Sequence, residues 1–153
     1  MSKLNNSNYL ETIINYTIET YNNERKALIF KNSPKLLIRN NRYYSLNQGT
    51  VDYHGVYQGK YLCFEAKMTN KLNLPWKNIK EHQWNFLQLA HQQQAISFII
   101  IYFSFYQQYY LVFINQLIIL RQKKLKISFQ WIKKNGSKLE LINPFLLDFL
   151  KII

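Results

Sequence analysis

Hydrophobic positions near the start of the chain recur at the spacing of a helix. Over residues 8–23, the recurring apolar side chains are Leu10, Ile13, Ile14, Ile18 and Tyr21. This spacing places them on one stripe that faces a core, and it predicts a helix over the whole range. Asn8 is the expected N-cap, with Glu11 three residues later as in a capping box.

Two short apolar runs follow, at 27–30 and 36–38, on either side of Ser33-Pro34. They predict two short strands bounded by a turn. Residues 39–49 then read RNNRYYSLNQG, a polar and aromatic stretch with two arginines. We expect a projecting loop or hairpin there.

The middle of the chain predicts a second hairpin and a helix. Residues 50–57 and 60–68 are two extended runs joined by a short turn. A connection follows, in which Pro75 lies just ahead of a helix expected from about Lys77 to Gln93.

The most apolar stretch, residues 95–114, is about as long as a membrane-spanning helix. Gln107-Gln108 interrupt it, and β-branched and aromatic residues dominate it. These features favour two buried strands that turn near Gln107. The apolar segment 144–153, PFLLDFLKII, predicts a helix after a basic stretch.

Composition indicates one domain with a large core and a basic surface. The chain has 153 residues, of which 48% are hydrophobic, and it contains 12 Tyr and 10 Phe. Its net charge is +12, from 20 Lys and Arg against 8 Asp and Glu. Such a domain attracts polyanions, and nucleic acid is the expected partner because neutralised phosphates release counterions. An anionic membrane surface and a merely solvated basic surface are the alternatives.

The single cysteine, Cys63, excludes an internal disulfide and a cysteine-cluster zinc site. Because it lies in the apolar run YLCFEA, a buried structural thiol is the expected state. The amino-terminal residues MSKLNNSNYLE contain no apolar signal-peptide core. We therefore expect a cytoplasmic protein that is not bound to a membrane.

Three ionisable residues interrupt the second hairpin in the pattern D-x(12)-E-x-K, namely Asp52, Glu65 and Lys67. Glu65 and Lys67 are two apart on a strand, so their side chains share a face, and strand pairing brings Asp52 near Glu65. Two close carboxylates repel each other, and a hard divalent cation such as Mg²⁺ or Mn²⁺ relieves the repulsion. The cation would activate a water molecule, and Lys67 would stabilise negative charge on a phosphate.

This pattern matches the active-site signature of the PD-(D/E)xK nuclease superfamily. By itself it is equally consistent with an exposed ion pair across a hairpin. The surrounding residues TVDYHGVYQGKYLCFEAKMT, followed by LPWKNIKEHQ, closely resemble the RecU family of Holliday junction resolvases. The resemblance is dense over residues 50–83, and it extends more weakly to Leu10-Glu11 and KNSPKLLI.

The resemblance implies a restriction-endonuclease-like α/β fold with a central mixed sheet flanked by helices, in one domain over 1–153. It also implies a homodimeric, Mg²⁺-dependent endonuclease that cuts four-way DNA junctions in recombination and repair, with Mn²⁺ as a possible substitute. The family's metal ligands fall here on Thr50, Asp52, Glu65 and Gln83. Its transition-state lysine falls on Lys67.

Further residues have both a functional and an ordinary interpretation. Glu11 could add a carboxylate to the site or serve as a surface or capping residue. His54 and His82 could contact phosphate, although ordinary hydrogen bonds in a hairpin and a helix are the simpler interpretation. The family's projecting stalk enters the junction centre, and the corresponding stretch 39–49 is shorter here. Its DNA-binding candidates are Arg39, Arg42, Tyr43 and Tyr44, whose basic and aromatic side chains suit phosphate contact and base stacking.

Two alternative functions remain open at this point. One is a different nuclease of the same superfamily that acts on duplexes or flaps. The other is a non-catalytic DNA-binding recombination factor, which the presence of Asp52, Glu65 and Lys67 disfavours.

Overall fold

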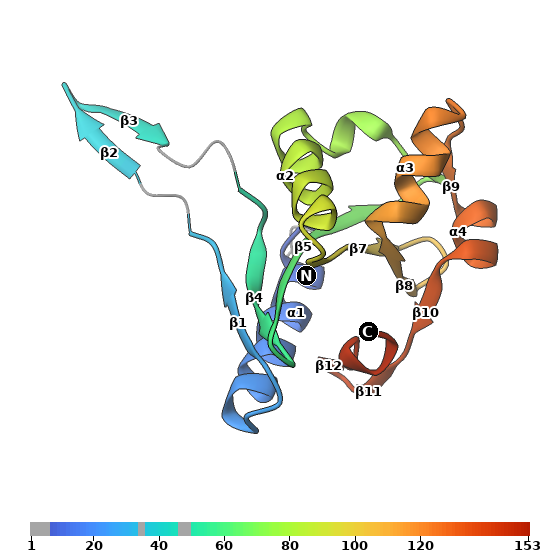
Figure 1. Ribbon diagram of the computed structural model, residues 1–153, viewed down its shortest axis with the longest axis horizontal. Coiled ribbons are helices and arrows are strands. Elements are labelled where there is room, and N and C mark those ends of the chain that lie inside the picture. The colour runs from blue at the N-terminus through green and yellow to red at the C-terminus, as the bar shows by residue number, and fades with distance from the viewer. Residues whose placement is uncertain (1–6, 34–35, 46–49) are drawn as a thin grey trace, which may run out of the picture.

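A six-stranded mixed sheet forms the centre of the protein, with the strand order β1-β4-β5-β7-β8-β10 (Figure 1). The computed structural model describes residues 7–33, 36–45 and 50–153, including their side chains except those of residues 7–8, 36–38 and 42–45. The strands are β1 (Leu28–Lys31), β4 (Tyr53–Tyr57), β5 (Lys60–Thr69), β7 (Ile96–Phe103), β8 (Gln108–Phe113) and β10 (Ser137–Leu139). Only β5 and β7 of these neighbours pair in parallel. The predicted mixed α/β architecture is confirmed.

Helices cover the two faces of this sheet. On one face lies α1 (Ser7–Asn23), and on the other lie α2 (Glu81–Gln92), α3 (Ile114–Gln122) and α4 (Phe129–Asn135) (Figure 1). Successive residues of β5 alternate between the two hydrophobic clusters, so that Phe64 packs on the α1 side and Cys63 on the α2 side. Cys63 is a buried free thiol, as predicted, and burial raises its pKa to about 11. The same alternation points Glu65 and Lys67 toward α2.

The stretch 95–114 forms the antiparallel pair β7 and β8, which confirms the prediction of two buried strands. Gln107, in the turn between them, has φ 51°. No helix among the described residues is long and apolar enough to cross a membrane.

The hairpin that contains the candidate site is β4 and β5, paired in the register Tyr53↔Phe64 to Tyr57↔Lys60. Its two-residue turn, Gln58-Gly59, has φ values of 48° and 76°. Positive φ at both turn positions is the geometry that suits the twist of an antiparallel pair. The turn thereby fixes the register, which sets Asp52 beside Glu65.

A second hairpin stands away from the body of the molecule, beyond the ends of β1 and β4 (Figure 1). It consists of β2 (Leu36–Arg39) and β3 (Arg42–Ser45), joined by Asn40-Asn41 with φ values of 51° and 55°. A hairpin was expected at 39–49, and the observed one begins at Leu36; residues 46–49 lie outside the described part of the chain.

Two predicted helix starts need correction. The first helix begins at Ser7, so Asn8 lies within its first turn and is not the N-cap. The middle helix begins at Glu81, and not near Lys77. A 3₁₀ turn, Trp76–Asn78, precedes it, and the intervening Ile79 is extended and buried against the core on the α2 side. Burial of Ile79 requires the chain to leave helical geometry before α2 starts.

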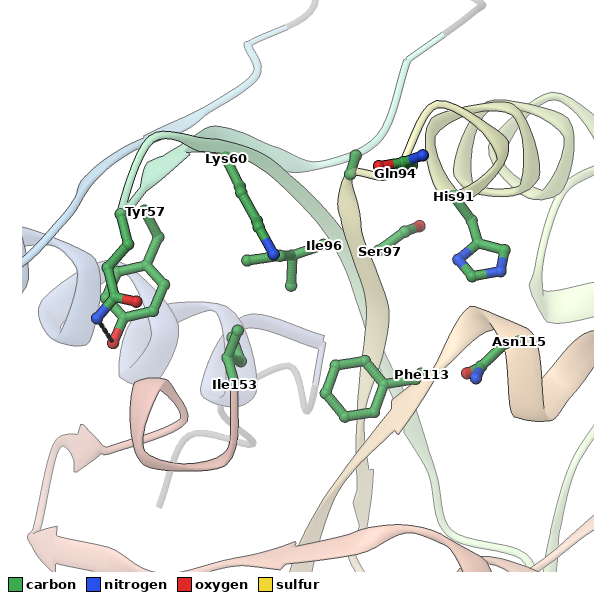
Figure 2. Close-up of a pocket in the computed structure, with 11 residues that line it drawn as sticks. Tyr57, Lys60, His91, Gln94, Ile96, Ser97, Phe113, Asn115 and Ile153 are labelled. Atoms are coloured by element: carbon green, nitrogen blue, oxygen red, sulfur yellow. Dashed lines mark hydrogen bonds between the residues drawn. The ribbon is translucent and has the colours of Figure 1, made fainter.

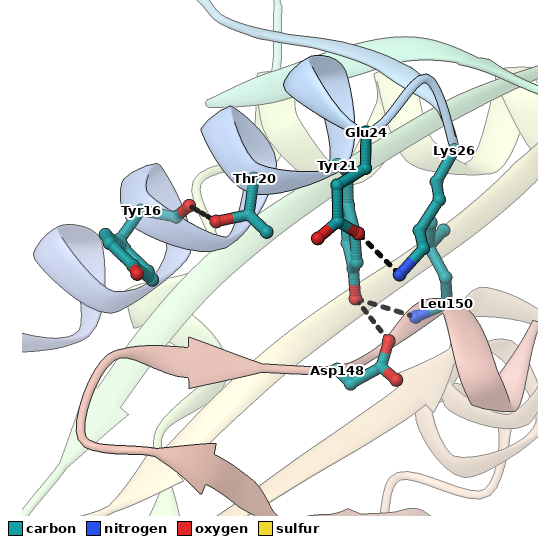
Figure 3. A network of polar contacts seen from close by, with 7 residues as sticks. All are labelled: Tyr16, Thr20, Tyr21, Glu24, Lys26, Asp148 and Leu150. Carbon is teal, nitrogen blue, oxygen red and sulfur yellow. Dashed lines mark hydrogen bonds and ion pairs between the residues drawn. The ribbon is translucent and has the colours of Figure 1, made fainter.

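The predicted helix over 144–153 is wrong. The segment contains β12 (Leu146–Leu147), which pairs with β11 (Leu141–Asn143), and a 3₁₀ turn at Leu150–Ile152. Its backbone is held by α1: Leu147 N–H donates to Thr17 Oγ1 at 3.0 Å, and Leu150 N–H donates to the Tyr21 hydroxyl at 3.3 Å. The same hydroxyl donates to Asp148 Oδ1 at 2.7 Å (Figure 3). These contacts with α1, which is distant in sequence, stabilise a non-helical backbone here although the local apolar pattern favours a helix.

The remaining short pair joins the loop after β5 to the region before α4. It consists of β6 (Asn73–Leu74) and β9 (Ile127–Ser128), which run antiparallel. This pairing holds in place the part of the chain that directly follows β5, the strand that carries Glu65 and Lys67.

Candidate active site

Glu65 is the centre of the candidate site. Its side chain is completely buried on β5, and Oε1 accepts a hydrogen bond of 2.9 Å from the backbone N–H of Asp52. The Lys67 ammonium lies 3.0 Å from Oε2 in an ion pair. This contact lacks hydrogen-bond geometry, and Oε2 has no hydrogen-bond partner among the described residues. Oε2 is therefore a buried carboxylate oxygen whose lost hydration is replaced only by the nearby Lys67 charge.

The protein environment favours the neutral form of this carboxyl group. Burial raises the pKa of Glu65 from 4.5 to about 8, although the Lys67 charge lowers it, and the nearby Asp52 charge raises it further. Desolvation thus outweighs the single ion pair. A second cation at the site would offset this cost.

Lys67 is held between Glu65 and α2. Its ammonium donates to Gln83 Oε1 at 3.0 Å, and its side chain is 14% exposed. The same Gln83 oxygen accepts the backbone N–H of Lys80 at 3.0 Å, which closes the start of α2. Gln83 therefore positions the lysine in this arrangement, and its oxygen would have to release one of these donors to ligate a metal.

Asp52 lies where two hollows meet. One, of about 250 Å³, is lined by Glu11, Lys31, Asp52 and Lys67 among others. The other, of about 210 Å³, is lined by Thr50, Asp52, Lys80, His82 and Gln83 among others. The structure thus brings together all four predicted metal ligands and the predicted lysine, with Glu65 buried beside Asp52.

Glu11 reaches the first hollow from α1 and forms an ion pair with Lys31 of β1. Because α1 begins at Ser7, Glu11 does not occupy the third helical position that the predicted capping box requires. Its carboxylate is 42% exposed, so it borders the site without being buried in it.

The donor set fits a hard divalent cation. The residues present offer the carboxylates of Asp52 and Glu65, the Thr50 hydroxyl and the Gln83 amide oxygen, and Glu65 Oε2 lacks a hydrogen-bond donor. Within the described ranges, no three His, Cys, Asp or Glu side chains gather into a metal-binding group. A cation here would consequently depend on the neutral oxygen donors and on water.

Of the other predicted residues, His82 lines the second hollow, whereas His54 and the projecting hairpin lie apart from this centre. Arg39 is exposed next to the Asn40-Asn41 turn of the projecting hairpin, and the side chains of Arg42, Tyr43 and Tyr44 lie outside the described part of the structure. His54 faces Phe30 and Tyr61, with ring centroids 6.3 and 6.2 Å away, so it belongs to an aromatic surface of the sheet.

A larger hollow, of about 410 Å³, lies at the opposite end of β5 and is shown in Figure 2. Its lining includes Lys60, His91, Ser97 and Phe113 but no Asp or Glu side chain and none of the predicted site residues. It therefore lacks the ligands that a hard cation needs.

Sequence reasoning missed Asn32, which anchors the Asp52 segment. Its backbone N–H donates to Asp52 O at 2.7 Å, and its side-chain Nδ2 donates to Val51 O at 2.8 Å. The only available signal was its place just after the predicted strand at 27–30, which does not reveal a partner 20 residues away. Lys31 and Lys80, which line the two hollows, were missed for the same reason.

Comparison with known proteins identifies the family to which this chain is similar. The model of the family described as Recombination protein U, RecU, matches residues 5–153. The chain is 37% identical to the Holliday junction resolvase RecU of Ureaplasma parvum serovar 3, covering 100% of this chain and 94% of that protein. It is 33% identical to the protein of the same name from Mycoplasmopsis pulmonis, over 98% of this chain and 94% of that one.

Among solved structures, the fold is similar to that of Hjc, a Holliday junction resolvase from Archaeoglobus fulgidus. The TM-score is 0.52 at 11% identity, over 84% of this chain and 93% of that one. At this identity the likeness supports the fold alone. The match over residues 5–153, together with the two relatives, establishes that this chain belongs to the RecU family.

Proposed function

We propose that this protein is a Holliday junction resolvase, a metal-dependent endonuclease that cuts four-way DNA junctions in recombination and repair. The observation that supports it most is the convergence of Asp52, Lys67 and the buried Glu65 at one point in a chain of the RecU family. The named relatives are Holliday junction resolvases, which supplies the substrate class. Action on DNA makes the cytoplasm the expected location.

Asp52 and Glu65 would hold the cation, assisted by Thr50 and Gln83, and Mg²⁺ is the proposed ion with Mn²⁺ as a substitute. When bound, a divalent cation supplies Lewis-acid activation of water and of a phosphoryl oxygen. The protein's own contribution is to exclude solvent from Glu65 and to fix the Asp52 backbone, whose N–H donates to Glu65 and whose carbonyl oxygen accepts from Asn32.

Lys67 would stabilise the negative charge that develops on the phosphate. Its ammonium is partly buried and held by Gln83, so its position is set before substrate binds. The hollow beside it opens to Asp52, where the scissile phosphate would lie.

DNA affinity would come from the basic surface and from the projecting hairpin. The net charge of +12 supplies non-specific attraction to phosphates. Arg39, Arg42, Tyr43 and Tyr44 lie on β2 and β3, which project beyond the sheet (Figure 1). We propose that the chain is a single nuclease domain over 1–153, in which this hairpin is a short stalk-like segment. We assign these four residues to the junction centre.

A homodimer would supply two active sites for two opposed strands. The sheet offers a surface for it: β1 is an open edge, and its exposed Leu28 and Phe30 lie beside the exposed Val56 and Tyr61 of β4 and β5. Cross-strand register places these side chains on one face. Since the projecting hairpin continues from β1 and β4, a two-fold axis near this face would bring two hairpins together (Figure 1).

The test is cleavage of a synthetic four-way junction beside a linear duplex and a flap of matched sequence, with Mg²⁺ or with EDTA. Wild type is expected to cut the junction in paired, opposed strands only with Mg²⁺. Asp52→Ala is expected to bind the junction and leave it intact, because phosphate contacts elsewhere supply affinity. Glu81→Ala is the matched control, since Glu81 is an exposed acidic residue paired with Arg121.

Each alternative has its own outcome. Equal cutting of duplex or flap would identify another nuclease of the superfamily. Junction binding without cleavage by wild type at any Mg²⁺ or Mn²⁺ concentration would identify a non-catalytic DNA-binding factor. Asp52→Ala cutting at the wild-type rate would contradict the site assignment.

A further inference from the structure

Three hollows that share lining residues lie one after another from the candidate site past the end of β5. The first is the cleft of Asp52 and Lys67, which also includes Met68. Met68 is shared with the second, of about 260 Å³, which extends to Lys71, Pro75 and Lys77. Lys71 and Pro75 are in turn shared with the third, of about 480 Å³.

The third hollow is apolar with basic ends. Its lining consists of Lys71, Leu72, Asn73, Leu74, Pro75, Trp76 and Lys126. Leu72 is 60% exposed, so a large apolar residue lies in solvent at a hollow that Trp76 and two lysines also line. None of the lining residues is acidic, so the hollow suits a flat apolar group attached to an anion.

Hydrogen bonds fix the walls without a ligand. Leu72 O accepts the Phe129 backbone N–H at 2.7 Å, and Trp76 Nε1–H donates to Leu125 O at 2.9 Å. The Trp76 ring also packs edge to face against the Trp84 ring, with 5.5 Å between the ring centroids. The hollow is thus formed before binding, which lowers the entropic cost of receiving a group.

We propose that this hollow receives a nucleobase of the strand whose phosphate lies at the candidate active site. The inference rests on the proposed nuclease function and adds a contact that discriminates between substrates. Lys71 and Lys77 would follow the intervening phosphates, and Leu72 with Trp76 would contact an unstacked base. Base-edge or base-face contacts of this kind are available where base pairs open, as at a strand exchange point.

Charge favours DNA as the occupant over a protein segment. The three hollows are lined in turn by Lys67, by Lys71 and Lys77, and by Lys126, so each has at least one lysine for a chain that carries repeated negative charges. A protein segment would need acidic residues at each step and would gain nothing from the link to the active site.

The test is an abasic scan measured by competition binding in EDTA, so that no strand is cut. A four-way junction carries one abasic position at a time in the strand near its exchange point. Wild type is expected to lose about fivefold to tenfold in affinity at one or two adjacent positions, the scale of one lost base contact. Leu72→Ala is expected to bind the intact junction correspondingly more weakly and to be indifferent to the abasic change at those positions.

Leu89→Ala is the matched control, because Leu89 is 57% exposed on α2 and lines none of the three hollows. It should reproduce the wild-type scan. A flat wild-type scan, or a Leu72→Ala scan with the same dip as wild type, would overturn the base-binding proposal. Failure of the nuclease proposal shows separately, as absence of Mg²⁺-dependent junction cleavage by wild type.

Discussion

Replacing Glu65 with Gln should change how the stability of the metal-free protein depends on pH. In the folded protein, burial raises the Glu65 pKa from 4.5 to about 8, whereas the unfolded chain retains the ordinary value. Below pH 4.5 both states are neutral at this position, so ionisation costs nothing. Between 4.5 and 8 the unfolded state ionises first, and wild type loses stability until the pH passes about 8.

The size of the effect follows from the same values. The rise from 4.5 to about 8 corresponds to about 5 kcal/mol at about 1.4 kcal/mol per pH unit. Glu65 is completely buried, so solvent screening does not reduce this figure. Because Lys67 can reorient to donate a hydrogen bond to the ionised group, we expect a measured difference of about 2–5 kcal/mol. Glu65→Gln removes the ionisation, and Lys67 keeps its hydrogen bond to Gln83.

The assay is urea unfolding of both proteins from pH 4.5 to 9 in EDTA at constant ionic strength. The wild-type minus Glu65→Gln difference should fall through this range and level off above pH 8, while other titrating groups cancel. Glu81→Gln, at an exposed carboxylate, should give no such difference. Parallel wild-type and Glu65→Gln curves would refute the assignment of a costly buried charge to Glu65.

Three further changes test the catalytic, structural and DNA-binding assignments. Lys67→Ala should lower the maximal cleavage rate about 10²–10³-fold with little change in Mg²⁺ dependence; a shifted Mg²⁺ requirement at an unchanged rate would contradict its role. Gly55→Ala should destabilise the fold by about 2–4 kcal/mol in urea unfolding, because an added Cβ would lie 2.0 Å from the Leu28 carbonyl oxygen. Gly59→Ala, in open space at φ 76°, should cost only about 1 kcal/mol, and equal losses would count against the steric account. Arg42→Ala with Tyr43→Ala should weaken junction binding more than duplex binding in competition at fixed salt, by about 1–3 kcal/mol per contact, whereas equal losses would indicate a general phosphate track.

The strand pairs of the fold were predictable because their signals are local. The apolar runs around Gln107 and the two extended runs of 50–57 and 60–68 each predict a pair of neighbouring strands joined by a short turn. The Asn40-Asn41 turn was also open to prediction, since Asn tolerates positive φ, and recognising it would have started the projecting hairpin correctly at Leu36.

The C-terminal segment was not predictable in the same way. Its apolar residues fit a helix, but Thr17 and Tyr21 of α1 accept its backbone N–H groups from about 130 positions earlier in the chain. Such partners are neighbours only in the folded protein, so the local sequence does not reveal them. Ile79 shows the same effect, because its burial decides where α2 begins.

One part of the candidate site follows from local sequence, and another part depends on contacts between distant parts of the chain. The spacing of Glu65 and Lys67 on one strand predicts their shared face, and the structure agrees, with 3.0 Å between the ammonium and the carboxylate. The complete burial of Glu65 and the dual role of Gln83 depend on where α2 packs, which local sequence does not encode.

Burial of Glu65 also links the proposed catalysis to folding. A carboxylate that is costly in the metal-free protein becomes favourable once a cation neutralises it, so a bound cation stabilises the folded state by RT ln(1 + [cation]/Kd). Glu65→Gln would remove both the cost and the ligand, and such a protein should be more stable in EDTA at pH 8 and unresponsive to Mg²⁺. On the proposed assignment, a cation bound beside Glu65 would offset the cost of a carboxylate that the sheet holds next to Cys63, Phe64 and Ile99.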